Sequence, residues 1–449
     1  MRKIKIAQIG TCANSHGNMI FNSLKKQNDI FEIVGYCMPE NEEEKFPEHV
    51  KIFEEYQRFT VEEIMTNPEI EAVTIETEEV YLTKYARMAV ENGKHIHMEK
   101  PGGTSLGDFE KLIAMLKEKQ TVFHTGYMYR YNPFVKELLQ KVKNGELGDI
   151  ISVEAQMNCM HSVNTRQWLA NFPGGMMFFL GCHLIDLILQ IQGMPERIIA
   201  LNKSTGVDGV HAEDYGMAIF EYKNGVSFAK TSAHELGGYA RRQFVVTGTK
   251  GTVELKPFEM YTENPSLLYT GKTEYHSENW GDLGQYSRTD AFDRYDDMMV
   301  SFAEMVRGET VNPYTYDYEL EAAKISFEGK TGFDVTEACS IHTYFLKIPK
   351  HNTYVDEWTD KTTGKISWSF NSIGEYIDDY QIYNSDKKLD IKAGTSWLLT
   401  SVDEINEVGN YYSISPLINW KRDDSYMLIM YLRDPCSVCF VAFKELHND

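Results

Sequence analysis

The sequence predicts an α/β protein built from three parts: an N-terminal doubly wound parallel sheet, a second α+β domain with an open antiparallel sheet, and a small all-β C-terminal domain. Up to about residue 125, apolar strand patterns alternate with helical patterns, which is typical of a parallel sheet. From about residue 150, longer alternating strands and hairpin turns such as Asn224-Gly225 replace that rhythm. We therefore expect domains over residues 1–125, 126–348 and 353–449.

The first strand, turn and helix have the order of a mononucleotide-binding unit. Residues 4–9 form an apolar strand, 10–17 a turn and 18–26 a periodic helix, followed by a second strand over 31–38. A Gly-x-Gly-x-x-Gly turn would have glycine where this chain has Cys12 and Ser15, so the approach to a pyrophosphate depends on Gly10 and small side chains. The acidic ribose-binding position falls near Met38, so the pattern does not distinguish NAD from NADP. We expect the cofactor to contact Gly10, Thr11, Cys12, Ala13, Asn14 and Met38.

A lysine follows the fourth predicted strand. The run over 93–101 alternates apolar residues with histidine and ends in Glu99-Lys100-Pro101, so the strand delivers Lys100 to the sheet edge where ligands bind in open α/β sheets. A lysine in that position can orient or polarise a substrate oxygen. The alternative is a solvated lysine at a strand end.

The second domain contains a candidate histidine on an apolar helix. Pro173-Gly174-Gly175 precedes a predicted helix over 176–191, in which His183 and Asp186 share one face. His183 is a candidate base or, alternatively, a core histidine, whereas we expect a structural role for Asp186. The loop before this helix and the domain junction provide polar and aromatic candidates for holding a sugar-like ring, although a surface loop is nearly as well supported. These candidates are Tyr129, His161, Asn164, Arg166 and Trp168.

Composition favours a small-molecule partner. The chain has 449 residues, and its 66 acidic against 45 basic residues give a net charge of −21, which disfavours nucleic acid and anionic membrane. No apolar run approaches the length of a membrane span, and we expect a cytoplasmic protein. Seven scattered cysteines predict reduced thiols, and Cys436 and Cys439 fit a core strand better than a metal site. We expect no metal.

The motifs together resemble the glucose-fructose oxidoreductase / inositol 2-dehydrogenase (Gfo/Idh/MocA) family over residues 4 to about 345. The resemblance is carried by Gly93-Lys94-His95, Glu99-Lys100-Pro101, Tyr129-Arg130-Tyr131-Asn132-Pro133, Gly174-Gly175, Gly181-Cys182-His183-Leu184-Ile185-Asp186, Glu213-Asp214 and Gly248-Thr249-Lys250-Gly251. It implies a Rossmann domain, an α/β substrate domain, NAD or NADP, and a sugar or cyclitol substrate. In that family Lys100 and His183 match catalytic positions, and we add Thr77, Glu99 and Lys100 to the cofactor site.

One departure from the family affects the substrate pocket. Many members have an aspartate four residues before the histidine, where this chain has Phe179, so a charge and a hydrogen-bond acceptor are lost beside His183. Phe179 either lines a more apolar pocket or faces the core. We expect an NAD(P)-dependent oxidoreductase acting on a secondary hydroxyl of a sugar, glycoside or cyclitol. The alternatives are a redox-neutral NAD-using glycosidase of the family and a catalytically silent sugar or cofactor sensor.

The C-terminal tail is unexpected for this family. Residues 365–370, 380–383 and 411–414 show a Trp-then-Tyr strand pattern that weakly resembles a fibronectin type III sandwich. Such a domain would dock onto the parent chain or onto a partner. We also expect a possible homo-oligomer formed through the open sheet.

Overall fold

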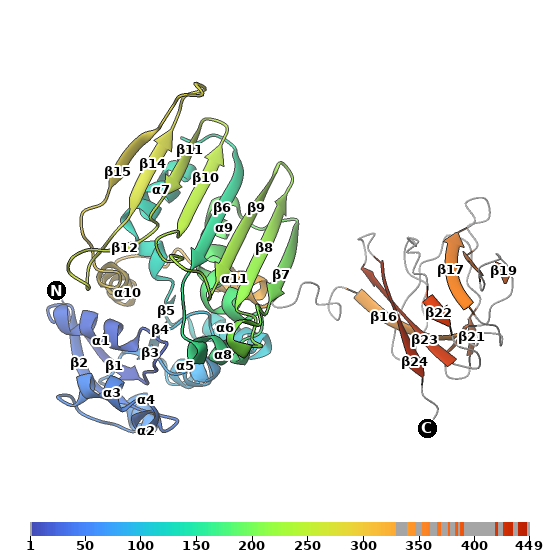
Figure 1. Ribbon diagram of the computed structural model, residues 1–449. Helices are drawn as coiled ribbons and strands as arrows, with labels where there is room; N and C mark the ends of the chain where they lie inside the picture. Colours follow the sequence, from blue (N-terminus) through green and yellow to red (C-terminus); the bar gives the residue numbers. More distant parts are fainter. Residues whose placement is uncertain are drawn as a thin grey trace. The chain divides into compact units, whose positions relative to one another are not determined.

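The computed structural model describes residues 2–328 and, of the remaining chain, the backbone of strands between residues 339 and 446. The chain divides into two compact units, Met1–Gly332 and Phe333–Asp449. The first unit contains a parallel sheet and a larger mixed sheet (Figure 1). In the described part of the chain, no helix has the length and apolar character needed to cross a membrane.

The N-terminal sheet has five parallel strands in the order β2-β1-β3-β4-β5. Its apolar strands are buried because helices lie on both faces. The strands are β1 (Ile4–Ile9), β2 (Phe31–Cys37), β3 (Ala72–Ile75), β4 (His95–Met98) and β5 (Phe123–Thr125). The helices are α1 (Gly17–Lys26), α2 (Glu42–Lys45), α3 (Pro47–Val50), η1 (Lys51–Phe53), α4 (Val61–Thr66), η2 (Glu79–Tyr81), α5 (Leu82–Glu91) and α6 (Leu106–Lys119). The carboxyl ends of β1, β3 and β4 therefore meet at one edge, which receives Gly10, Glu76 and Lys100.

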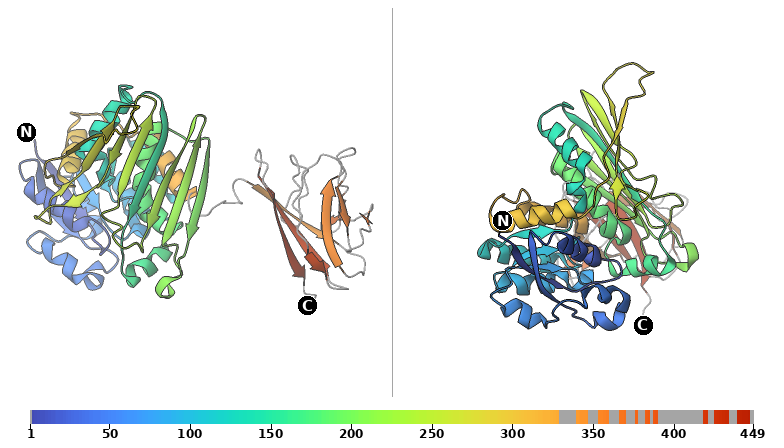
Figure 2. Two further views of the ribbon diagram at one scale, coloured as in Figure 1. Left: turned by 45° about the horizontal axis from the view of Figure 1, so that its top comes forward. Right: turned by 90° about the vertical axis from the view of Figure 1, so that its left-hand side faces the viewer.

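The second sheet has eight strands in the order β15-β14-β11-β10-β6-β9-β8-β7. β6 and β9 pair in parallel and the other neighbours are antiparallel, so the sheet is mixed rather than purely antiparallel. Buried and partly exposed residues alternate along β8 and β10, because helices cover one face only (Figure 2). The strands are β6 (Ile150–Asn158), β7 (Arg197–Lys203), β8 (Tyr215–Tyr222), β9 (Gly225–Ser232), β10 (Gln243–Gly248), β11 (Gly251–Leu255), β14 (Gly271–Tyr275) and β15 (Gln285–Arg288), with a separate hairpin of β12 (Met260–Tyr261) and β13 (Leu268–Tyr269). The predicted fold class is confirmed.

One local prediction for this part of the chain was confirmed and another was wrong. The helix expected over 176–191 is present, with a π-helical turn, η5 (Met177–Gly181), that leads into α9 (Cys182–Gln192). Gly181 permits close packing there, since a Cβ would lie 2.2 Å from Met177 Sδ. The loop expected over 161–168 contains helix α8 (Val163–Trp168), because Ser162 Oγ caps it by accepting from Thr165 N. The remaining helices are η3 (Met128–Tyr131), α7 (Pro133–Lys143), η4 (Leu169–Asn171), η6 (Val207–Gly209), α10 (Asp296–Arg307) and α11 (Tyr316–Glu328).

The described backbone of the C-terminal unit is β-structure. It forms two antiparallel sheets, with strand orders β21-β20-β16-β23-β24 and β19-β18-β17-β22. The strands are β16 (Cys339–Leu346), β17 (Thr353–Thr359), β18 (Ile366–Ser369), β19 (Tyr376–Ile377), β20 (Ile382–Asn384), β21 (Lys387–Leu389), β22 (Ile418–Trp420), β23 (Ser425–Arg433) and β24 (Cys439–Leu446). The strand predicted over 411–414 and Cys436 lie outside the described residues, and the fibronectin-like assignment stays a prediction.

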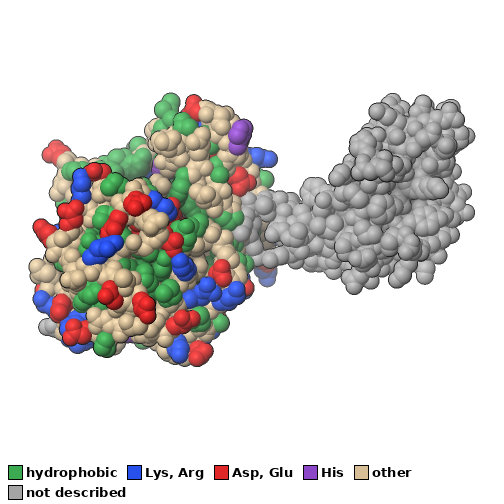
Figure 3. Space-filling view, turned by 90° about the horizontal axis from the view of Figure 1, so that it is seen from below, with side chains coloured by type: hydrophobic (Ala, Val, Ile, Leu, Met, Phe, Trp, Pro, Cys, Tyr) green, Lys and Arg blue, Asp and Glu red, His purple; other side chains and the backbone are tan. Residues whose placement is uncertain are grey.

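Charged side chains of both signs cover the first unit. Figure 3 shows acidic and basic groups interspersed over the face that it presents, without a continuous basic area. A single-sign basic surface is the usual electrostatic footprint of a nucleic-acid-binding protein. This face does not have one.

Candidate active site

The turn after β1 requires glycine at its first position. Gly10 has φ +79°, and a Cβ there would lie 2.4 Å from Thr77 Cγ2. The next two glycine positions of the pattern form a closed turn instead: Cys12 N donates to Ser15 Oγ (3.1 Å), and Ser15 N donates to Cys12 Sγ (3.2 Å). Hydrogen bonds of the Cys12 and Ser15 side chains therefore stabilise this turn, at the two positions where the pattern would have glycine.

The elements around this turn fit a dinucleotide. Helix α1 begins at Gly17 without a side-chain cap and without an acidic residue in its first turn, so its N-terminus is available for a phosphate group. Ala13 is exposed at the tip of the turn, as contact with a ligand requires. Met38 is buried after β2, and Glu40 beyond it accepts from Tyr85 Oη and Lys84 Nζ. We therefore regard the backbone geometry as compatible with a nicotinamide dinucleotide.

A buried carboxyl group also contacts the turn. Glu42 Oε2 accepts from Thr11 N at 3.0 Å, and its other oxygen has no hydrogen-bond partner in the described chain. Burial raises the pKa of Glu42 to about 8. A largely neutral carboxylic acid therefore lies beside the predicted phosphate-binding turn at pH 7, which reduces its repulsion of an anion.

Lys100 is not a solvated lysine at a strand end. Only 1% of its surface is exposed, and its Nζ donates to the Phe179 carbonyl at 3.0 Å. The same nitrogen lies 3.6 Å from Glu99 Oε1 and 4.2 Å from the centroid of the Phe179 ring. Burial alone would lower the pKa of Lys100, but the Glu99 and Glu79 carboxyl groups raise it above the ordinary value. Lys100 is therefore a buried ammonium group that contacts the helix preceding His183.

His183 is enclosed but has no hydrogen-bond partner. It is 1% exposed, and neither ring nitrogen has a partner among the described residues. The edges of Tyr127 and Tyr129 meet its ring at centroid distances of 5.7 and 4.9 Å. Burial, followed by the charge of Lys100, lowers the pKa of His183 well below its usual value. The ring is thus a neutral imidazole with a bare nitrogen available for a ligand hydroxyl.

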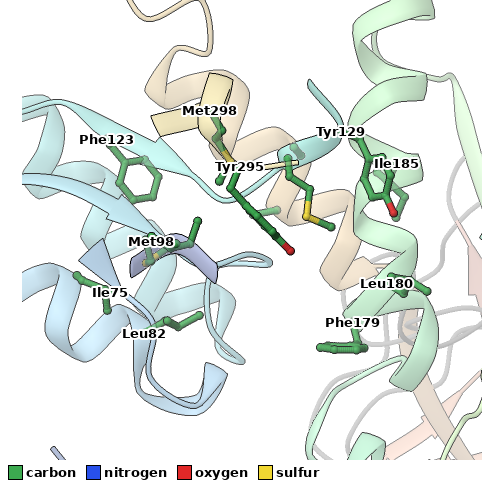
Figure 4. Packing of buried hydrophobic residues seen from close by; sticks show 14 of the residues in the cluster. Ile75, Leu82, Met98, Phe123, Tyr129, Phe179, Leu180, Ile185, Tyr295 and Met298 are labelled. Carbon is green, nitrogen blue, oxygen red and sulfur yellow. The ribbon is translucent and has the colours of Figure 1, made fainter. Parts of the chain in front are cut away.

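Phe179 belongs to an aromatic cluster beside Lys100. Its ring stacks on Phe172 at 5.7 Å and meets Trp168 edge-on at 5.0 Å. It is 7% exposed and points from η5 toward the N-terminal sheet, on the side that Tyr295 approaches from α10 (Figure 4). An apolar ring therefore occupies the position where the family resemblance led us to expect a carboxylate.

A second polar network orients Tyr129. Its hydroxyl donates to Glu259 Oε1 at 2.5 Å, and Arg242 Nη1 donates to the same oxygen at 2.6 Å. Arg294 Nη2 donates to Glu259 Oε2 at 2.6 Å, so one buried carboxylate binds two cations and a tyrosine. The sequence pattern gave no indication of Glu259 or Arg294. Glu259 lies 130 residues from Tyr129 in the sequence, whereas Arg242 and Arg294 lie 17 and 35 residues from Glu259.

The other predicted substrate residues are divided between the site and the scaffold. Trp168 is in the aromatic cluster, and burial followed by the charge of Arg242 lowers the pKa of the half-buried His161. Asn164 is exposed on α8. Arg166 is buried and donates to Asp208 and, at 3.4 Å, to Asp214, which indicates a structural role and argues against substrate contact.

Three acids at the strand ends were not predicted as a group. Glu76 and Glu79 follow β3, and Glu99 follows β4; each is at most 2% exposed. Glu99 Oε2 accepts from His16 Nδ1 at 3.1 Å, whereas both oxygens of Glu76 and of Glu79 lack partners in the described chain. Burial raises the pKa of Glu79 to about 8 and that of Glu76 well above its usual value. The run Glu76-Thr77-Glu78-Glu79 after a strand was the available signal.

Comparison with known families agrees with this architecture. Residues 4–127 match the oxidoreductase family with an NAD-binding Rossmann fold, and residues 135–254 match the GFO/IDH/MocA C-terminal domain. The chain belongs to the Gfo/Idh/MocA family. Its N-terminal domain is therefore a Rossmann domain of the NAD-binding type. In the described part of this Gfo/Idh/MocA protein, no group of three or more His, Cys, Asp or Glu side chains is placed to hold a metal ion.

Several individual relatives are enzymes. The chain is 26% identical over 200 residues to trans-1,2-dihydrobenzene-1,2-diol dehydrogenase of Bos taurus, covering 43% of this chain and 57% of that protein. It is 24% identical over 226 residues to scyllo-inositol 2-dehydrogenase (NADP(+)) of Bacillus subtilis, covering 49% and 61%. The chain thus spans little more than half the length of these curated relatives.

Solved structures share the fold. A 3-ketoreductase from Actinomadura kijaniata in complex with NADP and TDP-benzene has a TM-score of 0.61 at 15% identity, covering 74% of this chain and 98% of that one. Levoglucosan dehydrogenase in complex with NADH and levoglucosan has a TM-score of 0.59 at 16% identity, covering 73% and 96%. Their likeness extends over the Rossmann and mixed-sheet domains and shows the fold.

Proposed function

We propose that this chain is an NAD(P)-dependent oxidoreductase that acts on a secondary hydroxyl of a sugar, glycoside or cyclitol. The observation that carries the proposal is the buried pair of Lys100 and His183 in a Gfo/Idh/MocA chain, one a protonated ammonium and the other a neutral imidazole with no protein partner. These are the protonation states that alcohol oxidation needs, since one group must stabilise negative charge and the other must accept a proton.

The turn Gly10, Thr11, Cys12, Ala13 and Asn14, together with Met38, Thr77 and Glu99, would hold the cofactor. When bound, NAD or NADP supplies the hydride acceptor. His183 accepts the hydroxyl proton directly or through one water, and Lys100 stabilises the alkoxide. The Phe179 carbonyl holds Lys100 Nζ in place, so the ammonium group needs little movement to stabilise the substrate alkoxide. Tyr129, held by Glu259, restricts the His183 ring.

The aromatic cluster supports a substrate with an apolar face. Phe179, Phe172 and Trp168 offer ring surface where an aspartate would have bound a hydroxyl. We therefore expect glycosides with an aromatic aglycone to be better substrates than free hexoses, because a matched apolar or polar contact is worth about 1–3 kcal/mol. A homo-oligomer formed through the open sheet and a cytoplasmic location stay predictions.

The test is a substrate panel with matched variants. Lys100→Ala and His183→Ala should each reduce kcat/KM at least about 100-fold with an active polyol or glycoside, the usual effect of losing a proton-transfer group. Lys94→Ala and His95→Ala are the controls, since Lys94 donates to the carbonyls of Asn67 and Ile70 and His95 accepts from Val122 N, away from the site. Full activity of either site variant would refute its role.

Cys12 and Ser15 replace glycines of the cofactor-binding pattern, and Phe179 replaces the expected aspartate. These departures favour testing two alternative functions, a redox-neutral glycosidase and a silent sensor. A redox-neutral glycosidase would retain its cofactor through purification and cleave a glycoside without net formation of reduced nicotinamide. A silent sensor would bind a sugar without either reaction. Cofactor retention, glycoside cleavage and nicotinamide reduction, measured on one preparation, distinguish all three.

A further inference from the structure

Two buried histidines lie side by side beneath the active-site edge of the Rossmann sheet. His97 on β4 and His124 on β5 are register partners, are at most 1% exposed, and bring their Nδ1 atoms to 2.7 Å. At that distance one Nδ1 carries a proton and the other accepts it. Burial lowers the pKa of His97 to about 4 and that of His124 well below its usual value, so both rings are neutral. Each neutral ring therefore has one N–H and one bare nitrogen.

The pair extends outward to a tyrosine at the surface. His124 Nε2 lies 2.7 Å from Tyr131 Oη, a hydrogen bond between the second ring nitrogen and the hydroxyl. Tyr131 is half-buried and lines a cavity of about 530 Å³ together with Lys136, Ser301 and Tyr314. The outer end of the chain of contacts thus borders this cavity.

The same pair extends inward to Lys100. His97 Nε2 lies 3.7 Å from Glu76 Oε1, so proton transfer between them requires one of the two side chains to move closer. Glu76 has no donor in the described chain, and burial and then Glu99 raise its pKa, so it holds a proton that it can donate toward Glu99. Glu99 Oε1 in turn lies 3.6 Å from Lys100 Nζ. Six titratable side chains therefore lie one after another between the site and the cavity.

We propose that Lys100, Glu99, Glu76, His97, His124 and Tyr131 form a proton relay between the substrate oxygen and solvent. The proposal rests on the oxidoreductase function proposed above. Oxidation of a secondary hydroxyl transfers a hydride to nicotinamide and leaves one proton on His183, whose ring has no protein partner to receive it. Lys100 passes one of its protons to the carboxylate pair and regains the proton from His183 through the product oxygen or a water.

The remaining transfers conserve protons at every step. Glu76 gives its proton to His97 Nε2, His97 gives its Nδ1 proton to His124 Nδ1, and His124 gives its Nε2 proton to Tyr131 Oη. Tyr131 releases its own hydroxyl proton to water. Both imidazoles have then changed tautomer and must return to the first tautomer before the next oxidation. Reduction of a ketone runs the same transfers in reverse. Neutral rings are required throughout, because each must donate at one nitrogen and accept at the other.

The alternative is a structural polar pair. Both rings pack against Phe302, at centroid distances of 5.9 and 5.5 Å, so they also fill the core. A purely structural pair has no need of the Tyr131 hydroxyl or of Glu76. Variants that remove the hydroxyl or one imidazole while keeping ring volume therefore separate the two roles.

The first experiment measures proton exchange and needs no turnover. In ¹⁵N-histidine-labelled protein, the proton shared by His97 and His124 should exchange with solvent much faster than the protein unfolds, and Tyr131→Phe should slow that exchange at least about tenfold. Tyr314→Phe is the control, because Tyr314 lines the same cavity but donates to Gln190. Equal exchange in wild type, Tyr131→Phe and Tyr314→Phe would overturn the relay, whether or not the protein oxidises any sugar.

The second experiment measures turnover. With an active substrate, Tyr131→Phe and His124→Phe should keep the first-turnover burst of reduced nicotinamide and the KM, but lower steady-state kcat about tenfold or more, below the 10²–10⁴-fold effect of a direct proton-transfer group. Added imidazole should partly restore the His124→Phe rate. If burst and steady state fall together without rescue, the pair is structural. If wild type oxidises nothing while Tyr131→Phe still slows exchange, the proposed function fails and the proton pathway stands.

Discussion

Replacing Phe179 by aspartate tests whether this position belongs to the substrate pocket. The substitution introduces the carboxylate that the family resemblance predicts four residues before His183. The Phe179 ring centroid lies 4.2 Å from Lys100 Nζ, so the new carboxylate would face a buried ammonium group and not an apolar core. Phe179→Leu is the matched control, since it removes the ring and keeps an apolar side chain.

The magnitudes follow from these contacts. Losing the ring, which stacks on Phe172 and meets Trp168 edge-on, costs about 3–5 kcal/mol, as for other buried phenylalanines. Attraction to Lys100 at about 4 Å contributes ~4 kcal/mol at an effective dielectric constant of 20, and desolvation of the carboxylate costs several kcal/mol. The last two contributions nearly cancel, so we expect Phe179→Asp to unfold about 3–5 kcal/mol more easily in urea and Phe179→Leu about 1–2 kcal/mol more easily.

The assay compares kcat/KM for simple polyols with that for aryl glycosides. A carboxylate that finds a substrate hydroxyl is worth about 1–3 kcal/mol, so Phe179→Asp should gain about tenfold or more on at least one polyol and lose a similar factor on the aryl glycoside. Phe179→Leu should show no polyol gain. Loss of stability in Phe179→Asp with no gain on any polyol would refute the pocket assignment and place the ring in the core.

Two further predictions concern buried charges. Arg130, Asp186 and Glu319 form a buried triad with contacts of 2.7 to 3.0 Å. Asp186→Ala leaves Arg130 with Glu319 alone and should lower the free energy of unfolding in urea by about 3–5 kcal/mol. An unchanged urea midpoint would contradict this structural role of Asp186. In the folded state Glu42 keeps its proton up to about pH 8, whereas the unfolded chain releases it near pH 4.5. The free energy of unfolding should therefore fall as the pH rises between these values. Glu42→Gln should make this pH dependence flatter in urea titrations at several pH values. A dependence identical to wild type would contradict the assigned pKa.

Local patterns placed the two central side chains on a strand end and a helix, and the family resemblance singled them out as site candidates. Lys100 ends a strand with period-two alternation, and His183 follows a Gly-Gly turn on an apolar helix. The π-helix around Phe179 was not predictable, because the spacing of apolar residues in so short a segment does not distinguish it from an α-helix. Helix α8 was missed because its cap, Ser162, is also a common loop residue.

Contacts between distant segments were outside the reach of pattern reasoning. Arg130 and Glu319 are 189 residues apart, and Tyr129 and Glu259 are 130 apart, so nothing local pairs them. His97 and His124 meet because β4 and β5 are neighbours in a particular register, which the sequence pattern did not specify. The roles of Lys100, His183 and the pocket residues stay predictions until the variants are measured.

Buried charge is distributed unevenly between the two sides of the site. On the mixed-sheet side of the described chain, the buried Arg130 and Arg242 and the partly buried Arg294 have carboxylate partners. On the Rossmann side the buried carboxyl groups outnumber the cations; they are Glu42, Glu76, Glu79 and Glu99. Carboxyl groups without a cation keep their protons when buried, as the raised pKa values of Glu76 and Glu79 indicate.

That imbalance has a chemical consequence at Lys100. A carboxylate that is fully ion-paired stays charged and does not readily take up a proton. A protonated acid beside a carboxylate can release its proton and bind another. With an apolar ring at 179, the carboxylate expected there is not available to receive a proton from His183. Burial lowers the pKa of His183, so its protonated form gives up its proton readily. The groups able to buffer that proton are then the acids at the strand ends, reached through Lys100 and Glu99. The loss of a carboxylate on the helix and the excess of carboxyl groups beneath Lys100 therefore place the proton reservoir on the Rossmann side of the site.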